Sequence, residues 1–218
     1  MPTRYRRPYR RRRIVRKYRP RRRRQRIMRF NPRIHNFKET IEFSNISTST
    51  TSQYTYFGLS VNAAMAANMS SFANLFDSYR IMGVKLSFYP QYNVSYTQGT
   101  TVAGEIPMIY TAIDYDSDAT PATLSAVEQY ATCRRQFFNK PHSRYFRPKA
   151  TAYAAVTTSS TGYGVYNLAR STWMDMGNLN IKYFGLIGCI VFTNSSALPP
   201  ATQVRVTATL YYQCKGQR

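Results

Sequence analysis

Arginines dominate the first 38 residues of the chain, and their chemistry is that of phosphate binding. This segment contains sixteen arginines, two lysines and no acidic residue, so it carries +18 of the total formal charge of +22. The remaining residues carry only +4, from thirteen basic and nine acidic side chains. A guanidinium group pairs with phosphate through a planar fork of N–H donors and also stacks on bases. The sequence therefore predicts a polyanionic partner, and nucleic acid is the obvious one.

Aromatic rings are interleaved with these arginines, at Tyr5, Tyr9, Tyr18 and Phe30. Such rings stack on unpaired bases with about 1–3 kcal/mol per base. Repulsion between the like charges, together with four prolines, predicts an extended, solvated arm over residues 1–35. The arm suits single-stranded nucleic acid without sequence preference. Its predicted contacts are Arg4, Arg6, Arg7, Arg10, Arg11, Arg12, Arg13, Arg16, Lys17, Arg19, Arg21, Arg22, Arg23, Arg24, Arg26, Arg29 and Arg33.

Two basic clusters in the arm are also typical of a nuclear localisation signal. They are Arg10, Arg11, Arg12 and Arg13, followed by Arg21, Arg22, Arg23 and Arg24. Import and nucleic-acid binding are compatible functions, and the sequence alone does not separate them.

A second basic run covers residues 134–149 and contains no acid. Its cations are Arg134, Arg135, Lys140, Arg144, Arg147 and Lys149, with His142 and four aromatic residues among them. We predict a second nucleic-acid contact here, at Arg134, Arg135, Arg144 and Arg147. The alternative is that these charges form ion pairs between subunits or lie in solvated loops.

Asp114, Asp116 and Asp118 form the one cluster of carboxylates in the sequence. Their spacing matches the start of a calcium loop, but Ala119 stands where that loop needs glycine and Ser125 where it needs glutamate. These residues are therefore weak metal candidates, and an exposed loop or a salt-bridge partner of another subunit is the preferred interpretation. We predict no metal and no cofactor.

The sequence offers little that could support catalysis. It has no glycine-rich phosphate loop followed by Lys-Ser/Thr and no serine nucleophile elbow, and no lysine stands near the Asp114 group. We therefore predict that the protein is not an enzyme. The longest apolar stretch, Tyr183 to Phe192, has ten residues where about twenty are needed to span a bilayer, so membrane insertion is not expected. Three widely spaced cysteines predict reduced, packed thiols.

Alternating apolar and polar residues predict that the body is a β-sandwich. The pattern is strongest over residues 204–214, 82–89 and 40–44, and the uniformly apolar segment 183–192 predicts a strand that is covered on both faces. Weaker strand candidates lie at 54–61, 106–114, 144–156 and 163–171.

Two short helices are expected between these strands. One follows Asn62 as its N-cap and places Met65, Met69, Phe72 and Phe76 in the core, and the other opens at Thr120-Pro121 with Leu124 and Val127 on one side. The prediction is an all-β, eight-stranded jelly roll over residues 36–218 behind the basic arm.

Several motifs resemble those of circovirus capsid proteins. Residues 78–90 read Ser-Tyr-Arg-Ile-Met-Gly-Val-Lys-Leu-Ser-Phe-Tyr-Pro, and residues 142–149 read His-Ser-Arg-Tyr-Phe-Arg-Pro-Lys. Both resemble segments of that family, as do Arg205-Val206-Thr207 and Tyr183-Phe184-Gly185-Leu186. The stretch 157–178 and the tail after Cys214 show no such match.

The resemblance implies a viral jelly roll whose sixty copies enclose circular single-stranded DNA, with the arms pointing inward. It further implies a protein of the virion that visits the host nucleus during assembly. Its partners would be copies of itself, the genome, nuclear import receptors and a host cell-surface receptor. Two alternatives stay open: a monomeric nucleic-acid-binding protein of ribosomal or protamine type, and the coat protein of a small RNA genome. The choice of DNA rests on the resemblance alone.

Overall fold

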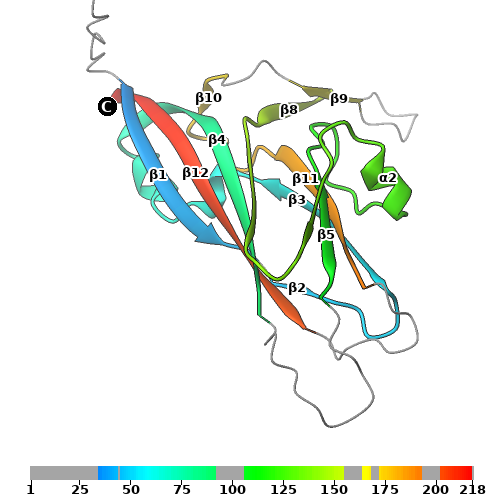
Figure 1. Ribbon diagram of the computed structural model, residues 1–218. Helices are drawn as coiled ribbons and strands as arrows, with labels where there is room; N and C mark the ends of the chain where they lie inside the picture. The colour runs from blue at the N-terminus through cyan, green and yellow to red at the C-terminus, as the bar shows by residue number, and fades with distance from the viewer. Residues whose placement is uncertain are drawn as a thin grey trace, which may run out of the picture. The chain divides into compact units, whose positions relative to one another are not determined.

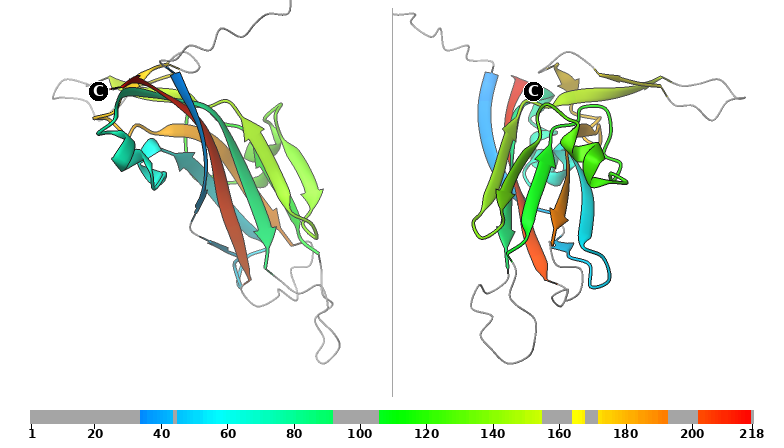
Figure 2. Two further views of the ribbon diagram at one scale, coloured as in Figure 1. Left: turned by 90° about the vertical axis from the view of Figure 1, so that its left-hand side faces the viewer. Right: turned by 45° about the vertical axis from the view of Figure 1, so that its right-hand side comes forward.

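Two antiparallel β-sheets lie face to face and form a jelly roll (Figures 1 and 2). The computed structural model describes residues 34–43, 45–91, 106–154, 164–167, 172–192 and 202–217. The chain divides into two units, residues 1–31 and 32–218, and all that follows concerns the second. Its first strand begins at Ile34, two residues before the predicted start of the jelly-roll domain.

The first sheet, here called sheet A, contains both the first and the last strand of the chain. Its strand order is β1-β12-β4-β10, with β2 paired to β12 and β7 paired to β4. The strands are β1 (Ile34–Glu42), β2 (Ile46–Ser47), β4 (Phe76–Pro90), β7 (His142–Phe146), β10 (Met174–Asp175) and β12 (Gln203–Gln217).

The second sheet, sheet B, is built around β11. Its order is β6-β5-β11-β8-β9, with β3 paired to β11. The strands are β3 (Tyr54–Val61), β5 (Met108–Ala112), β6 (Arg134–Phe137), β8 (Lys149–Ala154), β9 (Gly164–Asn167) and β11 (Tyr183–Val191). The single strand predicted over 144–156 is wrong, because Arg147 and Pro148 separate β7 in sheet A from β8 in sheet B.

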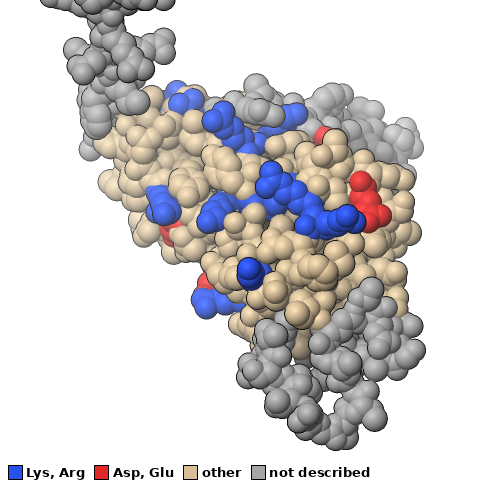
Figure 3. Space-filling model, in the orientation of Figure 1, with Lys and Arg blue, Asp and Glu red and all other residues tan. Residues whose placement is uncertain are grey.

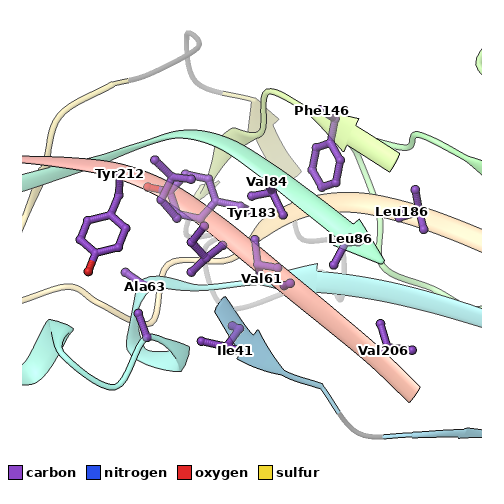
Figure 4. Packing of buried hydrophobic residues seen from close by; sticks show 14 of the residues in the cluster. Ile41, Val61, Ala63, Val84, Leu86, Phe146, Tyr183, Leu186, Val206 and Tyr212 are labelled. Carbon is purple, nitrogen blue, oxygen red and sulfur yellow. The ribbon is translucent and has the colours of Figure 1, made fainter. Parts of the chain in front are cut away.

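The hydrophobic core lies between the two sheets. From Val204 to Cys214, every second side chain of β12 is at most 3% exposed, as the alternation predicted. These side chains form one cluster with sheet B residues that include Val61 and Leu186 (Figure 4). The cluster holds the two sheets together by excluding water from both inner faces.

A β-bulge shifts the alternation in β4. Tyr211 and Tyr212 of β12 pair with Gly83 and Ile81, which leaves Met82 without a partner. The core-facing positions therefore change phase across the bulge. The predicted alternation over 82–89 places Met82 in the same phase as Val84, Leu86 and Phe88. In the structure Ile81 is buried and Met82 is only half-buried, so that prediction is wrong for Met82.

β11 buries both of its faces, as predicted. Its first eight residues are all buried. Some of its side chains join the core between the sheets, whereas Ile187 and Cys189 pack on the other side of sheet B with Val127 of α2 (Leu124–Glu128). The outer face of sheet B is thus covered by the chain itself.

The helices are shorter than predicted. Asn62 does cap the first, accepting a bond from the Met65 amide at 3.1 Å, but η1 (Ala63–Met65) and α1 (Met69–Phe72) replace one continuous helix. Phe76 begins β4, and Met65 is 41% exposed, so the core prediction for Met65 is wrong.

The second helix, α2, starts later than the sequence indicated. Thr123 is its N-cap, with its hydroxyl accepting from the Ala126 amide at 3.2 Å, so the start predicted at Thr120-Pro121 is wrong. In the described residues no helix is long and apolar enough to cross a membrane.

Candidate nucleic-acid interface

The arm joins the body at one end of sheet A. All the predicted contacts from Arg4 to Arg33 lie outside the described residues. The next residue, Ile34, pairs with Lys215 of β12, so the chain enters sheet A beside a lysine. The arm is therefore continuous in sequence with β1, the first strand of sheet A.

Cations and aromatic rings share the outer face of sheet A. The pairing registers set Ile34, Lys215, Ser78 and Asp175 on one rung. They set Asn36, Gln213 and Arg80 on the rung two residues further along, which faces the same side of the sheet. Farther along, Lys38 pairs with Tyr211 and Lys85 with Tyr145. We call this surface the basic–aromatic face and define it by Lys38, Arg80, Lys85, Tyr145, Trp173, Tyr211 and Lys215.

The tyrosines of this face are fixed in place by their neighbours. The rings of Tyr145 and Tyr211 meet edge to face at 6.1 Å, and the Lys38 ammonium lies 5.9 Å from the centre of the Tyr211 ring. Tyr145 lies across Gly83, where a Cβ atom would come within 2.3 Å of the tyrosine hydroxyl. A side chain at position 83 would displace the ring, so the glycine makes room for Tyr145, which is 55% exposed.

Positive charge on this side of the molecule is only partly compensated. Figure 3 shows many Lys and Arg side chains and few Asp or Glu side chains on one face of the body. Of the acids on the outer face of sheet A, Glu42 pairs with Arg205, and Asp175 accepts the Gly177 amide at 2.6 Å. Among the described residues the cations of this face form no salt bridge, and the exposed ring of Tyr145 and the partly exposed rings of Tyr211 and Trp173 lie among them. This combination suits a single-stranded polynucleotide, whose phosphates need charge and whose bases need stacking partners.

The second predicted contact, the basic run 134–149, does not form one patch. Arg134 pairs with Thr111 and Arg135 with Tyr110, so alternation sends the two side chains to opposite sides of β6. Both are exposed, as are Lys140 and Arg147. Arg134, Arg135 and Arg147 stay predicted contacts.

Arg144 has a structural position instead. It is 4% exposed, and its guanidinium donates to the Thr111 carbonyl at 3.0 Å, the Thr111 hydroxyl at 3.2 Å and the Thr132 carbonyl at 2.7 Å. β7 belongs to sheet A and Thr111 to sheet B, so the arginine ties the two sheets together at their edge. This burial corrects the predicted nucleic-acid contact at Arg144, because no donor of the buried group faces solvent phosphate.

His142 lies in the same buried network. Its Nε2 is 2.8 Å from the Thr111 hydroxyl, and its Nδ1 is 3.2 Å from the Gln136 side-chain oxygen. Burial, together with the nearby charges of Arg144 and Arg134, lowers the pKa of His142 to about 4. The same causes, burial and Arg134, lower the pKa of Arg144. The histidine is therefore neutral at physiological pH and bridges the two neighbours as a hydrogen-bonding group.

The three aspartates do not converge on a common point. Asp114 is buried, accepting the Tyr130 hydroxyl and the Asp116 amide at 2.8 Å each. Asp118 instead accepts Ser60 at 2.8 Å and Lys182 at 3.1 Å. Burial raises the pKa of Asp118, but these bonds outweigh it and lower the pKa overall.

Asp114, Asp116 and Asp118, the weak metal candidates, therefore do not form a common set of ligands. Within the residues that the structure describes, no three His, Cys, Asp or Glu side chains are placed to hold a metal ion. Salt bridging by Asp118 is found within the subunit, to Lys182. The three cysteines are free thiols, and Cys189 and Cys214 are buried.

Sequence reasoning overlooked most of the basic–aromatic face. Arg80, Lys85 and Lys215 are isolated in sequence, so no charge run marks them. The sequence feature that could have identified them is the strand alternation, because they occupy the positions of β4 and β12 that do not face the core. Trp173 carried no strand pattern that could have placed it beside them.

Comparison with known proteins gives a consistent result. The family model described as circovirus capsid protein matches residues 4–218. No curated protein sequence matches the chain. The 60-mer of BFDV capsid protein is similar in structure, with a TM-score of 0.62 and 16% identity over 84% of this chain and 94% of that one.

Two further solved structures are also similar. The decameric BFDV capsid protein has a TM-score of 0.55 and 16% identity over 84% of this chain and 99% of that one. Cucumber Necrosis Virus gives 0.50 and 12% over 85% and 57% of the two chains. At such identities these structures show the shared fold.

Proposed function

The chain belongs to the circovirus capsid protein family, and we propose that sixty copies assemble into a closed shell and package circular single-stranded DNA through the arginine-rich arm. A capsid protein is a component of the virion. The number sixty is supported by the BFDV capsid protein, which forms a 60-mer with the same fold. Circular DNA is supported by the motifs that this chain shares with the family.

The observation that carries the proposal is the division of charge along the chain. The first 38 residues carry +18 and the rest +4. Sixty such arms would supply about 1,080 positive charges, enough to offset on the order of a thousand phosphates. A nearly neutral body, in turn, can approach its copies without strong mutual repulsion.

Deletion of residues 1–33 tests the role of the arm. We expect the body to keep its β-rich circular dichroism, because every described strand begins at Ile34 or later. We expect the shells to lose most of their nucleic acid, measured by the ratio of absorbance at 260 and 280 nm. A matched control replaces the arm arginines by lysines, which keeps the charge. Arm-deleted shells that retain a full genome would contradict the proposal.

Nuclease typing identifies the polyanion. Nucleic acid extracted from purified shells should be degraded by DNase and resist RNase. RNase-sensitive contents would instead support the coat protein of an RNA genome.

We also propose that the two arginine clusters direct the protein to the host nucleus. A fluorescent reporter fused to residues 1–35 should accumulate in nuclei. Replacement of Arg10 to Arg13 and Arg21 to Arg24 by glutamine should leave it evenly distributed. Replacement of the arginines at 4, 6, 7, 16, 19, 26, 29 and 33, which removes eight charges outside the clusters, is the matched control. Loss of import in that control alone would contradict the assignment.

A further inference from the structure

The only tryptophan of the chain lies against two cations on the outer face of sheet A. Trp173 directly precedes β10, which pairs with the edge of β4 through Met174 and Tyr79. The Arg80 guanidinium carbon lies 4.3 Å, and the Lys215 ammonium 4.4 Å, from the centre of the indole ring. Both contacts are within the range of cation–π attraction.

Neither of these two cations forms a salt bridge with a carboxylate of the described residues. Arg80 donates its Nε to the Gln213 side-chain oxygen at 2.8 Å, and its terminal nitrogens enter no hydrogen bond within the described part of the chain. The salt bridges found in that part involve Lys182 and Arg205 instead. Asp175 shares the rung of Lys215, but its carboxylate accepts the Gly177 amide. Two like charges drawn to one ring repel each other, and a bound anion would relieve that repulsion.

The position of the cluster points to a particular anion. Lys215 pairs with Ile34, the residue at which the arm enters the body. A polynucleotide held by the arm can therefore reach this rung with little loss of chain entropy, because the arm is tethered beside it. Arginine and lysine bind phosphates. Trp173 is partly exposed, and the part of its indole that the two cations leave uncovered offers a stacking surface to a base. A base inside a duplex is already stacked on both sides, so an unpaired base fits this position better.

We infer that Trp173, Arg80 and Lys215 form a docking point for one unpaired nucleotide, with the base on the exposed part of the indole and its phosphate beside the cations. The inference rests on the proposed packaging of single-stranded DNA and gives it a defined contact on the body. The arm supplies most of the charge, and this docking point fixes where the strand leaves the arm for the basic–aromatic face.

The single tryptophan makes the test specific. Oligothymidylate is titrated into the full-length protein while tryptophan emission and the anisotropy of a labelled oligonucleotide are followed together. We expect emission to be quenched in parallel with binding. A duplex of equal length should bind through the arm with much less quenching.

Variants separate the docking point from the arm. Arg80→Gln with Lys215→Gln removes two phosphate contacts, so the slope of log K against log salt should fall by about 1.4, and the quenching should be largely lost. Trp173→Ala should weaken binding of the oligonucleotide about fivefold or more, the lower limit for the loss of one stacked base. Lys182→Gln, on the Asp118 side of the molecule, is the control for loss of one cation. Circular dichroism of each variant verifies the fold.

The outcomes distinguish this inference from the proposed function. Binding without change in tryptophan emission would overturn the docking point and leave packaging by the arm intact. An absence of any binding would overturn both. If the Arg80 and Lys215 variants quench normally but fail to assemble, the cluster contacts a second copy of the chain and the inference is wrong.

Discussion

The outer faces of the two sheets differ in what completes them. On sheet B, Ile187 and Cys189 meet Val127 of α2, so apolar side chains of the same chain cover apolar strands. On sheet A, the corresponding positions hold lysine, arginine, threonine and tyrosine, and no described helix packs on them. One face is covered within the subunit, whereas the other leaves lysines and the Tyr145 ring exposed.

The comparison shows that the two phases of a strand's alternation give two kinds of information. The positions that face the core report the fold, and the positions in the opposite phase report what lies outside it. The covered outer face of β11 is apolar, whereas the outer positions of β4 and β12 include basic and aromatic residues, which supports the proposed contact with a polyanion.

The largest effect is expected when a carboxylate is introduced on the outer face of each sheet and the two losses of stability are compared. Val127 is fully buried, so Val127→Asp should lower the free energy of unfolding by about 4 kcal/mol, because the carboxylate loses its hydration without gaining a partner. Thr40→Asp on sheet A, an exposed position, should change it by less than about 0.5 kcal/mol. Urea denaturation of unassembled subunits measures both. Equal losses would show that both faces are buried.

Substitution of two arginines of the basic run, one buried and one exposed, compares the two kinds of charge directly. Arg144→Met should cost about 3 kcal/mol, because it leaves the Thr111 and Thr132 carbonyls without their donor. Arg147→Met, at an exposed position, should stay within about 0.5 kcal/mol. The same denaturation experiment compares them, and a stable Arg144→Met protein would contradict a structural role.

Lowering the pH should reduce the free energy of unfolding, because His142 is buried at the edge of the sandwich in its neutral form. Its folded-state pKa of about 4 lies below the usual value of 6.5, so the unfolded chain binds the proton more readily. Stability is therefore complete above about pH 6.5 and falls as the pH drops, by about 2 kcal/mol at pH 5. Denaturation at several pH values measures this loss. His142→Gln should flatten the profile in that window, and an unchanged profile would assign the effect to another group.

The smallest effects are expected from single cations of the basic–aromatic face. Lys38→Gln and Lys85→Gln should each reduce the salt slope of binding to oligothymidylate by about 0.7, the contribution of one phosphate contact. Their stability should be unchanged, since both side chains are exposed. A slope identical to that of the unmodified protein would restrict binding to the arm and the docking point.

Local patterns in the sequence predicted most of the strands correctly. The predictions that were wrong concern features that depend on long-range contacts. The period of two in β12 and the apolar run of β11 depend only on neighbouring residues, and both predictions are confirmed. The bulge at Met82 depends on how β12 pairs with β4, which no local pattern of β4 reveals.

The candidate site was predicted less completely. Charge runs mark the arm, but they also drew attention to Arg144, whose partners Thr111 and Thr132 lie 33 and 12 residues away in sequence. A clue was present in the alternation of His142, Arg144 and Phe146, because Phe146 is an apolar residue in the same phase. The cations of β4 and β12 come together only through strand pairing, so no local sequence motif predicts that they share a surface.

The pairing of the first strand with the last has a consequence for synthesis on the ribosome. β1 stands at the edge of sheet A, and in the described residues its strand partner is β12, with Ile34 opposite Lys215. The basic arm and β1 therefore emerge long before the segment that can hold β1 in place. Contacts so distant in sequence form late. We expect the newly made arm to meet polyanions while the sandwich is still open, so that translation order gives nucleic acid the first opportunity to bind.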